Sequence, residues 1–377
     1  MFKLKAVNWR KLSHAYGSAR DVPQLFKALT SEDATTRGRA MDRLSASLCH
    51  QGITYSATAS SVPLFIELLQ HPDTHDKHEI LVLLRCFALG SDEDEFAGFL
   101  PTAQGDASNS ALPALLEGLS LYLRLLSDPD PKIRAASSYL LTCFAGAEPS
   151  VMEELSQAPF AEADPLAQGS LILNLPKGVV RKPEVQALLR EIVGREQKTI
   201  VQLAAAIRLT IEFQQETPLE AVAVLLAALA DFKPLSAPYK ELTSDVDDLV
   251  GDVADCLCLA GRGYRSQSLP RLAQVLDRSN SSAALKVAHA LLYLTFDPNG
   301  GPPYGERTPE QAAALRAIAG SRRAWRYNSN MAEILRSFGL PGHPIALQAY
   351  LEGRDPVQAM MDANAAGPGA EQTGSSG

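Results

Sequence analysis

The stretch that decides the fold is "SDPDPKIRAASSYLLTCFAG", which runs from Ser127 to Gly146. Asp130 precedes Arg134 by four residues, and apolar residues follow at helical spacing. An Asp just before such a pattern can cap a helix or bond the turn, and the Arg then lies one turn inside the helix. The pattern therefore predicts an amphipathic helix that starts next to Asp130.

The same pattern occurs about a hundred residues earlier, in "SEDATTRGRAMDRLSASL" from Ser31, where Asp33 and Arg37 have the same spacing. Ahead of each capped helix, a hydrophobic residue followed by Pro introduces an apolar pattern that predicts a first helix, and the same kind of pair recurs elsewhere in the chain. These pairs are Val22-Pro23, Val62-Pro63, Leu112-Pro113 and Leu269-Pro270. Pro is favourable near a helix start, where its missing N–H has no partner to lose. Each unit therefore reads as two helices joined by a short turn.

This two-helix unit of about 40 residues resembles a HEAT repeat. The resemblance is clearest over residues 21–146 and 266–296, while the pairs between them keep the two-helix rhythm but lose the Asp and Arg. It implies an all-α fold, an α-solenoid of HEAT-type helical hairpin repeats in which each pair buries one face against its neighbours. The expected division is an N-terminal cap (1–20), the repeat solenoid (21–300), a C-terminal helical cap (301–363) and a disordered tail (364–377).

Two echoing N-terminal motifs, "HAYGSARDVP" from His14 and "HQGITYSATASSVP" from His50, are similar to those that begin a group of bacterial HEAT-repeat proteins. That resemblance implies a non-enzymatic protein. We expect the polar residues of the motifs to meet between adjacent repeats, either as a buried hydrogen-bonded joint or open on the concave face. These residues are His14, Tyr16, His50, Gln51 and Tyr55. Pro63 either lies inside a helix that runs from Tyr55 to Leu69, or the helix begins only near Ser60.

Composition places the chain among soluble, cytoplasmic proteins. It has 377 residues, a formal net charge of −8 and five Cys. The odd Cys number indicates reduced thiols, the charged N-terminus lacks the apolar centre of a secretion signal, and the longest apolar run is far shorter than the roughly 20 residues of a membrane span. The acidic balance argues against general affinity for phosphate backbones.

Short motifs for chemistry have structural explanations. His71, His75 and His78 are predicted to lie in a solvated turn, and Cys256 and Cys258 point in different directions on a helix, so neither set predicts a metal site. No nucleophile elbow, phosphate loop, dinucleotide fingerprint or zinc-protease motif is present. We therefore expect no enzyme activity, no cofactor and no metal.

Carboxylates recur in "ELTSDVDDLVGDVADCLCLAG" from Glu241. On a continuous helix, Glu241, Asp245, Asp248, Asp252 and Asp255 would form one narrow stripe beside an apolar face. Such a stripe is either an ordinary solvated face or a docking strip for a basic protein. The loop residues Asp92, Glu93 and Asp94 could extend it.

One basic and aromatic stretch, "SRRAWRYNSN", carries Arg322, Arg323 and Arg326 beside Trp325 and Tyr327. It could bind an anion or stack on a nucleic-acid base, or it could pair with the acidic helix of its own chain. Three arginines give few phosphate contacts, so the stretch does not favour nucleic acid as the partner.

Repeat arrays usually act by binding, so the leading hypothesis is a non-catalytic solenoid with a protein partner. Its specific form is an immunity protein that neutralises a basic toxin domain through the acidic surface. The alternatives are a HEAT-like DNA-binding protein or DNA glycosylase, and a scaffold subunit of a larger complex.

Beyond residue 300, helices are expected at 309–320, 328–338, 343–352 and 355–363. Loops are expected at 90–110 and 231–240.

Overall fold

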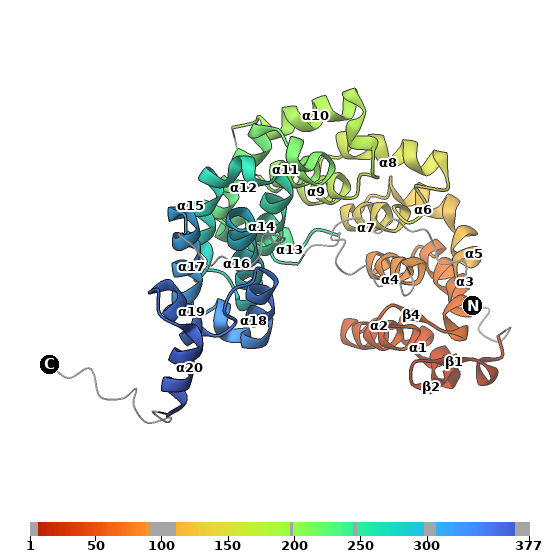
Figure 1. Cartoon of the computed structure of the whole chain (residues 1–377). Coiled ribbons are helices and arrows are strands. Elements are labelled where there is room, and N and C mark those ends of the chain that lie inside the picture. The colour runs from red at the N-terminus through yellow and green to blue at the C-terminus, as the bar shows by residue number, and fades with distance from the viewer. Residues whose placement is uncertain (1–6, 90–110, 197–198, 244–246, 298–306, 366–377) are drawn as a thin grey trace. The chain divides into compact units, whose positions relative to one another are not determined.

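A computed structural model describes residues 7–89, 111–196, 199–243, 247–297 and 307–365 (Figure 1). These residues form an all-α fold of twenty α-helices, with two minimal β-hairpins near the N-terminus. The chain divides into two compact units. Unit 1 holds residues 1–192, 200–208 and 241–246, and unit 2 holds 193–199, 209–240 and 247–377. All boundaries between the two units fall inside the predicted 21–300 segment.

Unit 1 consists of paired helices that follow the N-terminal hairpins. Its elements are η2 (Trp9–Lys11), β1 (Ser13–His14), β2 (Gly17–Ser18), η3 (Ala19–Asp21), α1 (Val22–Ala28), α2 (Ala34–Leu48), β3 (Cys49–His50), β4 (Ile53–Thr54), α3 (Ser56–Gln70), α4 (Lys77–Leu89), α5 (Leu112–Leu116), α6 (Leu119–Leu125), α7 (Pro131–Leu141), α8 (Pro149–Ala161), α9 (Pro165–Leu173), η4 (Val179–Arg181), α10 (Pro183–Val193) and the first part of α11 (Ile200–Phe213).

Unit 2 continues the helical arrangement to residue 365. Its elements are the end of α11, η5 (Gln214–Glu216), α12 (Leu219–Ala230), α13 (Lys233–Lys240), α14 (Leu249–Ala260), η6 (Arg262–Tyr264), α15 (Arg265–Val275), α16 (Ser281–Thr295), α17 (Pro309–Gly320), η7 (Ala324–Tyr327), α18 (Asn328–Ser337), α19 (Pro344–Leu351) and α20 (Pro356–Ala365). The four helices expected beyond residue 300 are confirmed as α17 to α20.

Within each unit, neighbouring helix pairs pack on one another. In unit 1, α1 pairs with α2, α3 with α4, α6 with α7 and α8 with α9, and the second helices α2, α4, α7 and α9 contact in succession. In unit 2, α15 pairs with α16, and α14 and α16 pack closely. Phe26, Phe65 and Phe87 form a buried aromatic row through the first two pairs, with ring centroids 4.6 and 5.9 Å apart. Each pair therefore buries its apolar face against the next.

Side-chain oxygens cap the second helices at their N-termini. Asp33 accepts the N–H of Thr36 at 2.9 Å, and Asp130 accepts that of Lys132 at 2.9 Å, as the spacing predicts. Asp164, Asp248 and Asn280 cap α9, α14 and α16 in the same way. The expectation that the middle pairs lose this Asp is therefore wrong for α14, which loses only the Arg.

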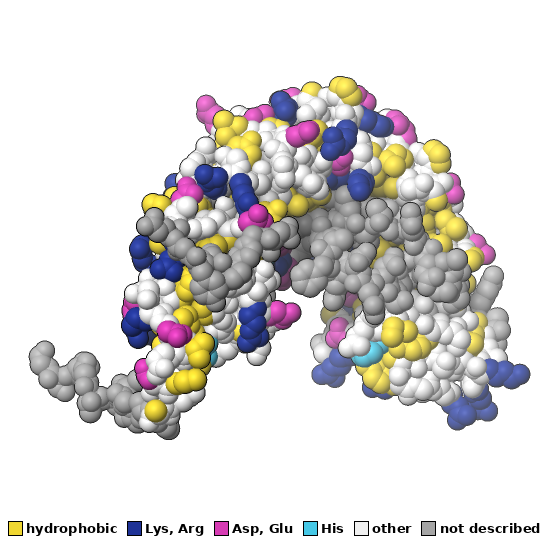
Figure 2. Space-filling model, viewed as in Figure 1, with side chains coloured by type: hydrophobic (Ala, Val, Ile, Leu, Met, Phe, Trp, Pro, Cys, Tyr) yellow, Lys and Arg dark blue, Asp and Glu magenta, His cyan; other side chains and the backbone are white. Residues whose placement is uncertain are grey.

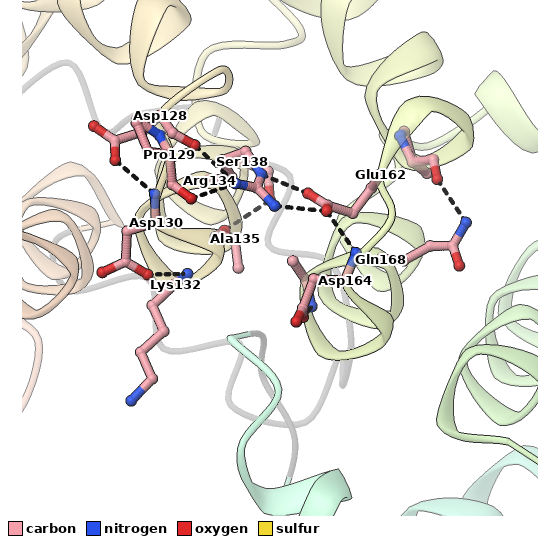
Figure 3. A network of polar contacts seen from close by, with 12 residues as sticks. Asp128, Pro129, Asp130, Lys132, Arg134, Ala135, Ser138, Glu162, Asp164 and Gln168 are labelled. Atoms are coloured by element: carbon pink, nitrogen blue, oxygen red, sulfur yellow. Dashed lines mark hydrogen bonds and ion pairs between the residues drawn. The ribbon is translucent and has the colours of Figure 1, made fainter.

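Two arginines link one inter-helix turn to the next; we call Arg37 and Arg134 the arginine bridges. Arg134 donates to the carbonyls of Asp128 and Pro129 in its own turn (2.8 and 3.1 Å) and to both carboxylate oxygens of Glu162 in the next (2.6 Å each) (Figure 3). Arg37 donates to the equivalent carbonyls of its own turn (2.9 and 3.0 Å) and to Asp76 (2.7 Å). The repeated sequence pattern thus corresponds to one repeated contact.

The residue type at the position of the arginine bridge differs between the second helices. This position lies four residues after the N-cap, where α9 has Gln168, α14 has Asp252 and α16 has Ala284. Gln168 still donates to a carbonyl, that of Pro159, at 3.0 Å. Asp252 reverses the charge at this position, so it needs donors rather than acceptors. This reversal is the local origin of the acidic site described below.

The two N-terminal motifs each form a β-hairpin that an all-helical reading does not anticipate. His14 pairs with Gly17 and His50 with Ile53, each across a two-residue turn. In the second turn, Gln51 and Gly52 have φ of 51° and 77°, the left-handed pair that a type I′ hairpin requires. α3 then begins at Ser56, so Pro63 does lie inside the helix, with its ring on the exposed side.

One expected loop is wrong and another lies outside the described residues. Residues 233–240 form α13, because Pro234 lies in its first turn, where a missing N–H costs nothing, and Tyr239 packs into the core fully buried. The loop expected at 90–110 falls outside the described residues. Among the helices that the structure describes, none has the length and apolarity needed to cross a membrane.

Candidate functional site

Four aspartates gather at the start of α14 in unit 2; Asp247, Asp248, Asp252 and Asp255, with Lys286 of α16, are here called the acidic cluster. Asp248 caps α14 through the N–H groups of Val250 and Gly251 and accepts Asn280 Nδ2 at 2.7 Å. Asp252 follows one turn later. The cap thus fixes where the later carboxylates emerge from the helix.

Asp252 is the buried centre of the acidic cluster, only 2% exposed. Its Oδ2 accepts the Tyr239 hydroxyl at 3.0 Å and the backbone N–H of Asp247 at 2.9 Å, while its Oδ1 accepts Lys286 Nζ at 3.0 Å. Three donors thus compensate the loss of water around this carboxylate, as a buried charge requires. Tyr239 reaches it from α13, the helix that replaces the expected loop.

Lys286 joins three carboxylates of the cluster. Its Nζ lies 3.0 Å from Asp252, 3.3 Å from Asp255 and 3.6 Å from Asp247. Gly251 makes this possible, because a Cβ there would lie 2.7 Å from the Lys286 Cδ. Three carboxylates share one ammonium group, so the cluster carries excess negative charge.

Electrostatics within the cluster reflect this crowding. Burial raises the pKa of Asp252 and of Asp255, and Lys286 only partly opposes it. Burial also disfavours the charged form of Lys286, but the neighbouring Asp252 and Asp255 outweigh it and raise the pKa of the ammonium. Burial lowers the pKa of the nearby His289. Lys286 is therefore firmly charged, while the carboxylates compete for a single cation.

The predicted five-residue stripe does not exist as one exposed helix face. α14 begins only at Leu249, so Glu241 lies outside it, exposed in a turn of unit 1. Asp252 is buried, because Tyr239 and Lys286 cover it. Asp245, Asp92, Glu93 and Asp94 lie outside the described residues. Within α14 and its N-cap, Asp248 and Asp255 of the predicted set remain partly accessible, and Asp247, which the prediction omits, joins them.

The five polar residues of the N-terminal motifs are here called the polar corner, and they divide into a buried and an exposed half. They are His14, Tyr16, His50, Gln51 and Tyr55. His14 is 6% exposed; its Nε2 donates to Asp21 at 2.9 Å, and its Nδ1 accepts the Tyr16 N–H at 3.1 Å. Tyr16 is 63% exposed and lies edge-on to His50, with ring centroids 5.7 Å apart. Both nitrogens of His14 are engaged, which suits a structural joint.

The remaining residues of the corner shape the connection to α3. Gln51 is exposed in the type I′ turn, and Tyr55 precedes α3, where its N–H donates to Thr58 Oγ1 at 2.8 Å. Thr58 in turn donates to the Leu48 carbonyl at 2.6 Å, and the Ser13 N–H donates to Ser56 Oγ at 2.9 Å. These bonds tie the hairpins to the ends of α2 and α3.

The basic stretch lies at the turn between α17 and α18; residues 321–327 are called the basic turn. Arg322, Arg323 and Arg326 are all exposed. Figure 2 shows Lys and Arg side chains over the α15 to α19 region on the face in view. Trp325 is anchored by its indole N–H, which donates to the Ile318 carbonyl at 3.0 Å.

No group of three or more His, Cys, Asp or Glu within the described ranges has the arrangement to hold a metal ion. His71 and His75 precede α4, which begins at Lys77, so they do not share a helix face with His78. Cys256 is buried and Cys258 half-buried, and burial raises the pKa of both thiols.

Sequence reasoning misses two residues that organise the acidic cluster and one buried charge in unit 1. Lys286 and Tyr239 are separated in sequence from the Asp252 they contact, and no spacing rule connects them. Arg208 is fully buried, where it donates to the Leu175 carbonyl at 3.0 and 3.1 Å. A charged residue inside a strongly apolar helix pattern, as in "IVQLAAAIRLTIEF", is the one signal that could have marked it.

No family model matches the chain, and no curated protein matches it. Among solved structures, it resembles two engineered proteins of the Northeast Structural Genomics Consortium. The first is 17% identical, with a TM-score of 0.35, and the match covers 92% of this chain and 82% of that chain. The second is 16% identical, with a TM-score of 0.26, and the match covers 92% and 98%. At such TM-scores neither likeness supports an inference about fold or function.

Proposed function

We propose that the chain is a HEAT-type α-solenoid that binds a basic protein partner at the acidic cluster. The observation that carries the proposal is the imbalance around Lys286, where three carboxylates lie within 4 Å of one ammonium group. Asp247 and Asp255 are 64% and 40% exposed. A basic side chain from a partner would find carboxylate oxygens that the chain itself leaves accessible.

The buried half of the cluster supports this role. Asp252 fixes Lys286, and Lys286 in turn holds the Asp255 carboxylate, so the accessible oxygens are ordered before a partner arrives. Ordered side chains lose less conformational entropy on binding. The cluster is also partly desolvated, so each charge–charge contact is stronger than on an open surface. Complementary charge further increases the association rate.

The specific form of the proposal is an immunity protein that neutralises a basic toxin domain. The repeated helix-pair pattern and the formal net charge of −8 support it. An acidic inhibitor can mask a basic domain by occupying the surface that binds the domain's own anionic substrate. A gene for a basic secreted toxin next to the gene for this chain would identify the partner to test.

The experiment is a titration of that toxin domain into the purified chain, followed by calorimetry at 150 mM salt. D247N/D255N removes the two exposed charges and keeps the buried Asp252–Lys286 pair. E32Q/D73N is the matched control, since both side chains are highly exposed in unit 1 (97% and 89%) and the change in net charge is the same. We expect D247N/D255N to weaken binding at least tenfold and the control less than twofold.

Two results would contradict the proposal. Absence of a complex between the chain and the neighbouring toxin domain removes the immunity role. A complex that both double variants weaken equally shows general attraction by net charge instead of docking at the acidic cluster.

A further inference from the structure

The basic turn presents three arginines whose guanidinium groups take no part in holding the fold. Arg322, Arg323 and Arg326 lie within five residues and are all exposed. Their guanidinium groups make no hydrogen bond or ion pair with any residue that the structure describes. Like charges so close together repel one another, and no carboxylate in the described part of the chain pairs directly with these guanidinium groups. An anionic partner would relieve this repulsion.

The turn is nevertheless firmly built from other groups. Asp277 Oδ1 accepts the Ser321 hydroxyl at 2.7 Å and the backbone N–H of Arg323 at 3.3 Å. The Ser321 Oγ accepts the Ala324 N–H at 3.1 Å, and the Trp325 indole is anchored to the backbone. One carboxylate thus holds the backbone of the turn, so the guanidinium groups extend from a preorganised base.

The helical geometry of the turn sets the spacing of two of the arginines. η7 is a 3₁₀-helix with Arg323 as its N-cap in helical conformation. Residues three apart eclipse in such a helix at a rise of about 2 Å per residue, so Arg323 and Arg326 leave the same face about 6 Å apart. Each guanidinium can bind a carboxylate through two parallel hydrogen bonds. Tyr327, 48% exposed, adds an aromatic surface beside them.

We propose that the basic turn is a second docking surface, which binds an acidic polypeptide segment through Arg322, Arg323 and Arg326. It is independent of the acidic cluster and has the opposite charge. A segment with two or three carboxylates satisfies the turn completely. Nucleic acid fits less well, because three phosphate contacts release few counterions.

The test uses fluorescence anisotropy with three labelled probes at 50 mM salt: deca-glutamate, deca-lysine and a ten-residue oligothymidine. R322Q/R323Q/R326Q removes the site. R10Q/R20Q/R39Q is the control, since these arginines are exposed in unit 1 and the change in net charge is equal. We expect deca-glutamate to bind the full chain, the first variant to bind it at least tenfold more weakly, and the control to stay within twofold. D247N/D255N should not weaken this binding.

Three outcomes would overturn the proposal: no binding of deca-glutamate to the full chain, equal loss in both triple variants, or tighter binding of oligothymidine than of deca-glutamate. Circular dichroism of each variant verifies that it is folded. Deca-lysine reports separately on the acidic cluster, so a failure of one docking surface does not decide the other.

Discussion

Replacing Arg134 by Met tests whether the arginine bridges hold neighbouring helix pairs together. The substitution removes two hydrogen bonds to Glu162, whose side chain is only 4% exposed, and two to backbone carbonyls. Removing one partner of a buried ion pair costs about 3–5 kcal/mol. Arg134 is 19% exposed, so water can replace part of the loss, and we expect the low end of this range, about 3 kcal/mol.

Substitutions at two further arginines provide a comparison for the loss of stability expected in R134M. Arg37 makes the same bridge, but its partner Asp76 is 37% exposed, so R37M should cost about 1 kcal/mol, nearer to a surface pair. Arg124 is exposed, and among the described residues its side chain donates only to the Ser120 carbonyl in its own helix. R124M should therefore change stability by less than about 0.5 kcal/mol. The expected order of destabilisation is R134M, then R37M, then R124M.

Hydrogen–deuterium exchange of peptides from α7 and α9 is the suitable assay, because it measures local opening without assuming that the two units unfold together. A loss of about 3 kcal/mol corresponds to roughly 100-fold faster exchange. The double variant R134M/E162Q should recover part of it, because a neutral amide replaces the orphaned charge. Exchange in R134M no faster than in R124M, or no recovery in the double variant, would refute the reasoning.

Three other predictions concern unit 1. Burial works to raise the pKa of Glu162, but the hydrogen bonds and charge of Arg134, together with backbone N–H groups of the turn, outweigh it and lower the pKa below 4.5. The stabilising contribution of Glu162 is thus complete above pH 4.5 and is lost as the pH falls through the lowered value. Acid titration by circular dichroism should therefore show a shallower loss in E162Q, and equal slopes would contradict this. Tyr122 is fully buried, and its hydroxyl has no hydrogen-bond partner among the described residues. Y122F should therefore raise the free energy of unfolding, measured in urea, by about 1 kcal/mol. A lower free energy of unfolding would show that the hydroxyl has a partner. A Cβ at Gly118 would lie 2.3 Å from the Tyr122 hydroxyl, whereas one at Gly146 would meet nothing within 4 Å. G118A should therefore lower the thermal midpoint of unfolding by the equivalent of about 1–3 kcal/mol, and G146A should leave it unchanged. Equal midpoints in the two variants would argue against this packing.

Helix positions could be predicted well from the sequence because their signals are local. The bounds of α17 to α20 agree closely with those expected, since Pro309, Pro344 and Pro356 mark the helix starts. Asp33 and Asp130 cap their helices as their spacing predicts. The hairpins at His14 and His50 escaped prediction, because two-residue strands are too short to show an alternating pattern. The sequence predicts a loop at 231–240 because two prolines lie close together there. The structure forms a helix at 233–240 instead, with Tyr239 fully buried.

The sequence by itself determined the all-α class and the repeated turn chemistry, because periodicity and capping act within a few residues of the chain. Only the tertiary structure decided which charges are paired. Five regularly spaced carboxylates read as one exposed stripe, yet Asp252 is buried against Lys286, which lies in another helix. Arg134 and Asp252 both lie four residues after an N-cap, yet one forms an arginine bridge and the other is a buried carboxylate. Helical spacing predicts which residues share a helix face, whereas burial and pairing depend on the helices that pack against that face.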